Sequence, residues 1–331
     1  MIIESRAFAR AGLLGNPSDG YFGKTISIIV RNFSASVSIY ETPELVIEEC
    51  EEDTNQFRNI YHLVDSVKLS GYYGGSRLIK AAIKKFAEYC DKNSINLPRK
   101  NFTVRFRTSI PRQIGMAGSS AIVTATMRGL MKFYEVSIPD HILPSIILSV
   151  ETDELGINAG LQDRVIQVYE GCVYMDFNKE HIQKHGHGIY EPIQPSLLPK
   201  LYMAYKTELG KVSGPVFNNL KERYLAGDKL TVDTLAEIGS LAEQGKDAIL
   251  NQDFTRLNSL INRNFDLRCK IMNISASNME LVNTARGCGA SAKFSGSGGA
   301  IIGMYEDDEM LNRLIINLRK INARVLKPII L

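Results

Sequence analysis

Residues 110–121 read IPRQIGMAGSSA and join a predicted strand to a predicted helix. Gly115 and Gly118 allow this segment to turn tightly and to approach a ligand with its backbone. Ser119 and Ser120 follow at the expected helix start, where unpaired N–H groups and the positive end of the helix dipole attract anions. The segment is therefore a candidate phosphate-binding loop, and the Ser120 hydroxyl is a candidate Mg²⁺ ligand.

The same segment has a simpler interpretation, which the loop alone leaves open. Serine is a favoured N-cap residue, so Ser119 and Ser120 are also compatible with an ordinary capped helix. The chain contains neither a GxxxxGK[ST] phosphate loop nor a GxGxxG dinucleotide motif after a strand. Any nucleotide site must therefore belong to another class.

Alternating and helical spacing of apolar residues predicts the elements around the loop. Strands are predicted at residues 8–14, 25–30, 34–40, 45–49, 102–106, 172–177, 201–205, 301–305 and 323–329. Helices are predicted at residues 55–67, 77–90, 119–134, 141–154, 213–226, 232–250, 253–272 and 309–320. Residues 178–199 are rich in His, Gly and Pro, which favours a linker or a crossing between domains. The sequence predicts an α+β chain with an N-terminal domain over 1–190 and a C-terminal domain over 191–331.

The composition is that of a soluble globular protein. The chain has 331 residues, of which 44% are apolar and 23% charged, and its formal charge is +3. This small charge predicts neither a nucleic-acid nor a membrane surface. The five cysteines are widely spaced, which favours free thiols over a zinc site. Free thiols are typical of a reducing compartment, so a cytoplasmic location is expected.

Three segments together resemble the motifs of the GHMP kinases, which include galactokinase, homoserine kinase and mevalonate kinase. Residues 111–121 resemble the PxxxGLGSSAA loop of that family. Residues 10–23, RAGLLGNPSDGYFG, resemble its first motif, and residues 289–299, GASAKFSGSGG, resemble its third, glycine-rich motif. The three occur in the family's order and extend over nearly the whole chain, which makes a chance match improbable.

Further stretches resemble the plant-type glucuronokinases within that family. They include GYYGG at 71–75 and ELGINAGLQDRVIQVYEG at 154–171. The resemblance implies ATP-dependent phosphorylation of D-glucuronate at its anomeric hydroxyl. It also implies an N-terminal domain like domain 2 of ribosomal protein S5 and a ferredoxin-like C-terminal domain. A kinase for another sugar, such as a heptose or galacturonate, and a non-catalytic regulatory relative are the alternatives.

The resemblance assigns the nucleotide to the 111–120 loop and the metal to oxygen ligands. The nucleotide-binding residues it implies are Pro111, Gly115, Met116, Ala117, Gly118, Ser119 and Ser120. Ser120 and a helix carboxylate are expected to hold Mg²⁺, which prefers oxygen ligands. Glu151 is the predicted carboxylate, and Asp153 and Glu154 are its rivals.

The acceptor side of the site is expected to centre on Asp163, which matches the family's catalytic aspartate. It can accept or orient the proton of the acceptor hydroxyl, although a helix N-cap is its competing structural role. Arg10 is expected either to act on that hydroxyl or to keep Asp163 ionised, with a structural ion pair as the alternative. Asp19 is expected to hold sugar hydroxyls.

Two features remain less defined in the sequence. Gly296 and Ser297, in the third motif, are expected to contact substrate or phosphate, although a glycine run also suits a plain turn. A sugar acid needs a cation for its carboxylate, and arginine suits this through bidentate hydrogen bonding. Arg77, Arg112 and Arg164 are equal candidates.

The sequence indicates a surface position for His181, His185 and His187.

Overall fold

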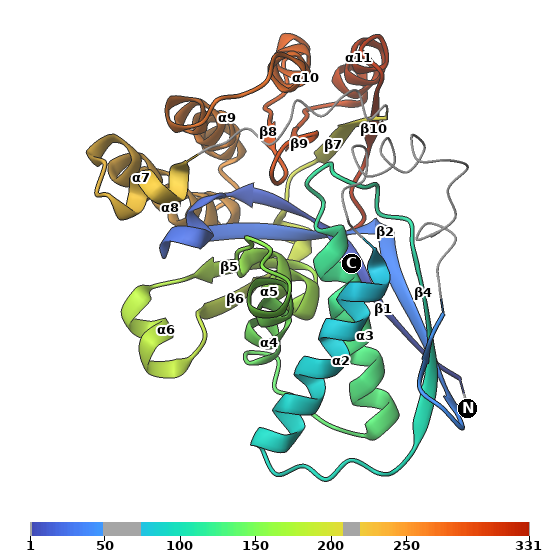
Figure 1. Ribbon diagram of the computed structural model, residues 1–331. Helices are drawn as coiled ribbons and strands as arrows, with labels where there is room; N and C mark the ends of the chain where they lie inside the picture. The colour runs from blue at the N-terminus through green and yellow to red at the C-terminus, as the bar shows by residue number, and fades with distance from the viewer. Residues whose placement is uncertain (1, 49–73, 208–218, 331) are drawn as a thin grey trace, which may run out of the picture. The chain divides into compact units, whose positions relative to one another are not determined.

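The computed structural model describes residues 2–48, 74–207 and 219–330, which form two compact units (Figure 1). The first unit comprises Met1–Ala9, Phe33–Ile110 and Gly118–Gly160. The second comprises Arg10–Asn32, Pro111–Ala117 and Leu161–Leu331. Strands β1 (Ile2–Leu14) and β2 (Lys24–Thr42) each contribute residues to both units. The domain boundary near residue 190 stays a prediction.

The first unit combines antiparallel strands with a pair of helices. The outer part of β2 pairs with β4 (Asn101–Thr108), and the short β3 (Val46–Ile47) pairs with β4 in parallel. Helices α2 (Gly75–Lys92) and α3 (Gly118–Tyr134) lie side by side (Figure 1). The predicted 141–154 helix is α4 (Leu143–Ser149), continued by a π-helical turn, η3 (Val150–Glu154).

The first part of the second unit is a small antiparallel sheet. The start of β2 pairs with β5 (Cys172–Asp176), and β5 pairs with β6 (Ile189–Ile193). The linker expected over residues 178–199 is therefore wrong, because the segment contains α6 (Lys179–His185), β6 and the 3₁₀ turn η4 (Pro195–Leu197). A domain crossing in this segment stays a prediction. The Asn178 side chain caps α6, and Gly186, at φ 78°, ends it.

The C-terminal part of the second unit has a four-stranded antiparallel sheet in the order β10-β7-β9-β8. Its strands are β7 (Leu201–Lys206), β8 (Lys293–Phe294), β9 (Ala300–Met304) and β10 (Ala323–Leu326). Helices α7 (Leu220–Leu225), α8 (Lys229–Leu250), α9 (Phe254–Ile271) and α10 (Ala276–Gly287) connect β7 to β8, and α11 (Asp308–Arg319) connects β9 to β10. This is the strand–helix–strand–strand–helix–strand order of a ferredoxin-like domain.

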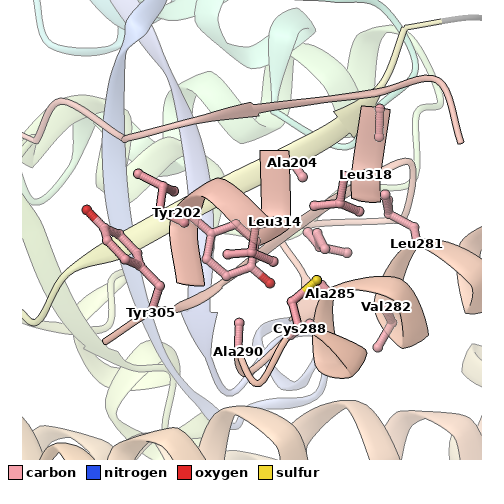
Figure 2. Close-up of a cluster of buried hydrophobic side chains, with 14 of the residues drawn as sticks. Tyr202, Ala204, Leu281, Val282, Ala285, Cys288, Ala290, Tyr305, Leu314 and Leu318 are labelled. Carbon is pink, nitrogen blue, oxygen red and sulfur yellow. The ribbon is translucent and has the colours of Figure 1, made fainter. Parts of the chain in front are cut away.

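A continuous apolar core joins this sheet to α10 and α11 (Figure 2). Tyr202 and Ala204 of β7 pack with Leu281 and Val282 of α10, and Leu314 of α11 belongs to the same cluster. Removing so much apolar surface from water is the main force that holds such layers together. The strands and helices together confirm the predicted α+β class.

The remaining differences from the predicted elements are local. The two strands expected at 25–30 and 34–40 are one continuous strand, β2. Helix α10 was not predicted, because its sequence ASNMELVNTARG places few apolar residues at helical spacing. The helix predicted at 55–67, Tyr72, Tyr73 and Cys50 lie outside the described residues.

Candidate active site

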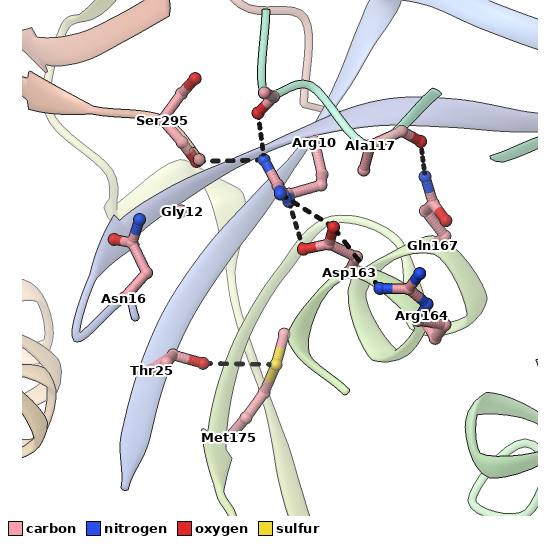
Figure 3. A network of polar contacts seen from close by, with 12 residues as sticks. Arg10, Gly12, Asn16, Thr25, Ala117, Asp163, Arg164, Gln167, Met175 and Ser295 are labelled. Carbon is pink, nitrogen blue, oxygen red and sulfur yellow. Dashed lines mark hydrogen bonds and ion pairs between the residues drawn. The ribbon is translucent and has the colours of Figure 1, made fainter. Parts of the chain in front are cut away.

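Arg10 and Asp163 form a bidentate ion pair in the second unit (Figure 3). Arg10 Nε donates to Asp163 Oδ1 at 2.6 Å, and Nη2 donates to Oδ2 at 2.8 Å. Arg10 lies on β1, and Asp163 lies in the first turn of α5 (Gln162–Tyr169). Because Leu161 occupies the N-cap position of α5, the N-cap interpretation of Asp163 is wrong. The carboxylate is instead held in a fixed orientation by a planar guanidinium.

The surroundings of Asp163 favour its ionised form. Burial alone acts to raise the pKa of this carboxyl group. The charges of Arg10 and Arg164, with hydrogen bonds from Arg10 and Gln162, outweigh burial and lower the pKa below its ordinary value. Asp163 is therefore an anion at neutral pH, ready to accept a hydrogen bond or a proton.

Arg10 also ties together the backbones of the two glycine-containing segments of this unit. Its Nη1 donates to Gly115 O at 2.6 Å and to Ser295 O at 3.1 Å. A Cβ atom at Gly296 would lie 2.1 Å from Gly115 O and 2.7 Å from Arg10 Nη1. The two segments therefore touch through their backbones, which explains the glycine at 296. The structure thus brings Gly115, Arg10, Asp163 and Gly296 together.

The part of the predicted phosphate loop that belongs to the second unit is held in an unusual conformation. Ala117 has a φ of 62°, which is rare for a residue with a side chain. The Gln167 side chain donates to Ala117 O at 2.9 Å (Figure 3). Arg10 N also donates to Met116 O at 3.3 Å. Gln167, which the sequence analysis did not select, fixes the loop from α5. Pro111 is partly exposed at the start of this segment.

Asp19 lies in the short 3₁₀ turn η1 (Ser18–Tyr21) of the same unit. Burial, and then the negative charge of Asp163, raise the pKa of Asp19 to about 6, although Arg10 and a backbone hydrogen bond from Gln162 oppose this. The pKa values of two neighbouring carboxyl groups are thus shifted in opposite directions. Such a division is typical of acid–base sites, where it separates an anionic acceptor from a group able to donate.

The first unit contains the other half of the predicted loop. Helix α3 begins at Gly118, and Ser119 Oγ donates to Glu151 Oε1 at 2.8 Å. Glu151 is fully buried in η3, whereas Glu154 pairs with Lys84 at 2.7 Å and with Lys85 at 3.2 Å. Glu151 is thus the acid that contacts the serine pair, through Ser119. Metal ligation by the buried Ser120 stays a prediction.

The other rival for the metal site, Asp153, is a weaker candidate than Glu151. Asp153 is 61% exposed and lies 3.9 Å from Lys85, so it has the character of a surface residue. Across the described residues, no group of three or more His, Cys, Asp or Glu side chains is arranged to hold a metal ion. A carboxylate and hydroxyls beside a phosphate loop remain a suitable set of oxygen ligands for Mg²⁺, which keeps water and phosphate oxygens in its coordination shell.

A buried polar network beside Gly296 was missed in the sequence. Asn264 Oδ1 accepts from Gly15 N at 2.8 Å, and Lys293 Nζ donates to Gly12 O at 2.7 Å and to Asn16 Oδ1. Arg268 Nη1 donates to Gly296 O at 2.9 Å. One available signal was the spacing of Asn264 and Arg268, four residues apart on the apolar face of α9.

The three arginines predicted for a substrate carboxylate have different surroundings. Arg77 belongs to the first unit, and Arg112 is exposed. Arg164 is buried, with Nη1 3.6 Å from Asp163 Oδ2.

His181, His185 and His187 lie together, and the ring centroids of the first two are 4.4 Å apart. None of the helices in the described ranges has the length and hydropathy required to cross a membrane.

Comparisons with known proteins identify the family of the chain. The family model for the GHMP kinases N terminal domain matches residues 77–171, and the model for GHMP kinases C terminal matches residues 246–320. Glucuronokinase 1 of Arabidopsis thaliana is 48% identical over 91% of this chain and 84% of its own length. Probable glucuronokinase 2 of the same plant is 47% identical with the same coverage.

The comparison with solved structures shows the same fold as a known kinase. Mevalonate kinase of Methanococcus jannaschii superposes with a TM-score of 0.70 at 20% identity, covering 99% of this chain and 98% of its own. With two family models and two relatives near half identity along nine-tenths of its length, the chain belongs to the GHMP kinase family.

Proposed function

We propose that the protein is an ATP-dependent sugar kinase that phosphorylates D-glucuronate at the anomeric hydroxyl, giving glucuronate 1-phosphate. The observation that carries the proposal is the Arg10–Asp163 pair, in which the same arginine binds Gly115 of the phosphate loop. The names of the two plant relatives, with 48% and 47% identity, support glucuronate as the acceptor. In this proposal Asp163 is the anionic base. It accepts the proton of the anomeric hydroxyl, whose oxygen takes the γ-phosphate of ATP to give the 1-phosphate.

In this mechanism the protein positions groups and stabilises charge. Asp163 accepts the proton of the acceptor hydroxyl or orients that hydroxyl toward the γ-phosphorus. Arg10 keeps Asp163 ionised and fixes the direction of its oxygens. The backbone of residues 115–120 and the N-terminus of α3 bind the ATP phosphates. Asp19, Gly296 and Ser297 contact the sugar.

Mg²⁺ belongs to this proposal as a partner of ATP, held by Glu151 with Ser120 or its neighbour Ser119. When bound, the ion neutralises phosphate charge during transfer. Glu151 suits this role because its carboxylate is buried next to a serine hydroxyl, 2.8 Å away, at the start of α3. The buried position limits the carboxylate to one orientation.

Glu151→Gln is expected to raise the Mg²⁺ concentration for half-maximal activity by at least about tenfold, because an amide is a weaker ligand for a hard cation. The measurement is initial rate against free Mg²⁺ at saturating ATP. Asp153→Asn is the matched control, since Asp153 is 61% exposed two positions away, and it should leave the curve in place. An unchanged Mg²⁺ requirement in Glu151→Gln would remove Glu151 from the metal site.

The proposed activity is tested with a panel of free sugars and ATP, with the product identified by ³¹P NMR. Glucuronate should give an anomeric phosphate with kcat/KM at least about tenfold above galacturonate, glucose and a heptose, because these lack its combination of charge and stereochemistry. Strong preference for a neutral sugar would overturn glucuronate as substrate. Absence of ATP consumption with every acceptor would favour the non-catalytic alternative.

The proposal includes a cytoplasmic location, where ATP is available. The free state of Cys90, Cys172, Cys269 and Cys288, the four cysteines among the described residues, supports a reducing compartment.

A further inference from the structure

Arg268, on the buried face of α9, is a cation without a carboxylate partner in the described part of the chain. It is 4% exposed, and it contacts the Gly296 carbonyl and the ring of Phe294, whose centroid lies 5.1 Å away. Its Nε is buried with no hydrogen-bond partner. A guanidinium has five N–H donors, so one carbonyl and one aromatic ring leave most of its hydrogen-bonding capacity unused.

The charged residues near Arg268 in the described ranges do not provide it with an ion-pair partner. Arg10 is matched by Asp163. Lys293 is 1% exposed, and burial, followed by the charges of Arg268 and Arg10, lowers its pKa well below the ordinary value, while its amine donates to Gly12 O and Asn16 Oδ1. Burial lowers the pKa of Arg268 only to about 10, so Arg268 keeps its charge at neutral pH. Of these three cations, Arg268 alone has a buried N–H group, at Nε, without a hydrogen-bond partner among the described residues.

A buried charge without a counterion is costly, whereas a paired and hydrogen-bonded one is tolerated. An anion bound at this place, beside Arg268, would therefore supply the missing counterion. This place lies beside the acceptor side of the candidate site, because Gly296, whose carbonyl Arg268 binds, touches both Gly115 and Arg10. Asp19 also acts on Arg268 electrostatically, although the two form no ion pair.

We propose that Arg268 binds the carboxylate of the sugar-acid substrate and thereby selects acidic over neutral sugars. This inference rests on the proposed glucuronate kinase activity. The planar guanidinium matches both oxygens of a carboxylate, which a carboxamide or hydroxymethyl group does not reproduce. Arg268 thus replaces Arg77, Arg112 and Arg164 as the specificity-determining arginine.

The test compares glucuronate with glucuronamide, a neutral analogue of the same shape, in the wild type and in Arg268→Gln. The wild type should prefer glucuronate, and Arg268→Gln should lower kcat/KM for glucuronate by about 10²-fold, as expected when one partner of a buried charge pair is removed. It should leave kcat/KM for glucuronamide within about threefold, because the amide never formed that pair. The KM for ATP should not change.

Arg263→Gln provides the matched control on the same helix. Arg263 is 46% exposed and pairs with Glu237, so its replacement should leave both acceptors unaffected. Equal losses for glucuronate and glucuronamide in Arg268→Gln would show that Arg268 is only structural and would overturn the inference. An unchanged preference for glucuronate would overturn it as well.

Arg268→Lys keeps the charge but not the planar fork, and it keeps the inference testable if circular dichroism shows that Arg268→Gln is unfolded. The KM for glucuronate should rise at least about fivefold in Arg268→Lys, with a smaller change for glucuronamide. An unchanged KM for glucuronate would overturn the inference. A wild type that phosphorylates a neutral sugar and not glucuronate would overturn the proposed function itself, whereas the variant results above concern Arg268 alone.

Discussion

Asp163→Asn is expected to lower kcat by at least about 10²-fold, with KM for ATP changed by less than about threefold. The physical reason is the loss of the anion that accepts the proton of the acceptor hydroxyl. Both carboxylate oxygens of Asp163 accept from Arg10, at 2.6 and 2.8 Å, whereas an asparagine NH₂ group would face one of these donors. The variant therefore loses both the base and its orientation.

The measurement is steady-state kinetics with ATP and glucuronate, each varied at saturation of the other. Asp153→Asn makes the same chemical change at an exposed position and should retain wild-type kinetics. Asp163→Asn with undiminished kcat would remove Asp163 from the chemistry and leave the Arg10 pair as a purely structural contact. A loss confined to KM for ATP would assign Asp163 to nucleotide binding instead.

The sequence predicted the components of this site better than their contacts. Asp163, Arg10, Gly115 and Gly296 were selected from motif positions, and the structure brings them together in one unit. The sequence left open whether Arg10 acts on the hydroxyl or on Asp163. The coordinates show the pairing with Asp163, which no sequence window could reveal because the two residues are 153 positions apart.

The fold was predictable where apolar spacing is regular. Helices α8, α9 and α11 agree with their predicted ranges to within a few residues. The segment from 178 to 199 was missed because Gly and Pro obscured β6, which gains its stability from pairing with β5. Helix α10 was missed because its apolar residues are few. That they form a buried helix face is visible only in the core that α10 shares with α11.

Arg268 shows why part of the site could not be predicted. In the sequence it is one of many arginines on an amphipathic helix, where a solvent-exposed role is the ordinary expectation. Its importance depends on burial, on the Gly296 carbonyl and on the absence of an ion-pair partner among the described residues. These are properties of the assembled unit and not of a sequence window.

Arg10→Gln is expected to lower the free energy of unfolding by about 3 kcal/mol, because removing one partner leaves a buried charge uncompensated. The side chains of Arg10 and Asp163 are only 7% and 19% exposed, so solvent cannot replace the guanidinium. The variant also loses the hydrogen bonds from Arg10 to Gly115 O and Ser295 O. Calorimetry should therefore record a lower unfolding midpoint. Steady-state kinetics at 25 °C should show a lower kcat.

The pH dependence of Arg10→Gln follows from the same pair. In the wild type the pKa of Asp163 lies below its unfolded value, so its contribution to stability is present above that value and is lost as pH falls through the folded pKa. Without Arg10, only Arg164 and Gln162 still oppose burial, so the folded pKa of Asp163 rises above its wild-type value. The variant is therefore destabilised at neutral pH, and less so in acid. The stability difference from the wild type should shrink below about pH 4, and the acid limb of kcat/KM should move to higher pH.

The double variant Arg10→Gln/Asp163→Asn separates stability from catalysis. Because it removes both charges, it should recover much of the unfolding midpoint lost in Arg10→Gln, whereas kcat should remain as low as in Asp163→Asn. Arg263→Gln, which removes an exposed pair, should shift the midpoint little, since exposed ion pairs contribute about 0–1 kcal/mol. If the two single changes were additive in stability, the Arg10–Asp163 interaction would contribute nothing to the fold. If the double variant also regained activity, Asp163 could not be the group that receives the proton, and the chemistry proposed for this site would have to be assigned to another residue.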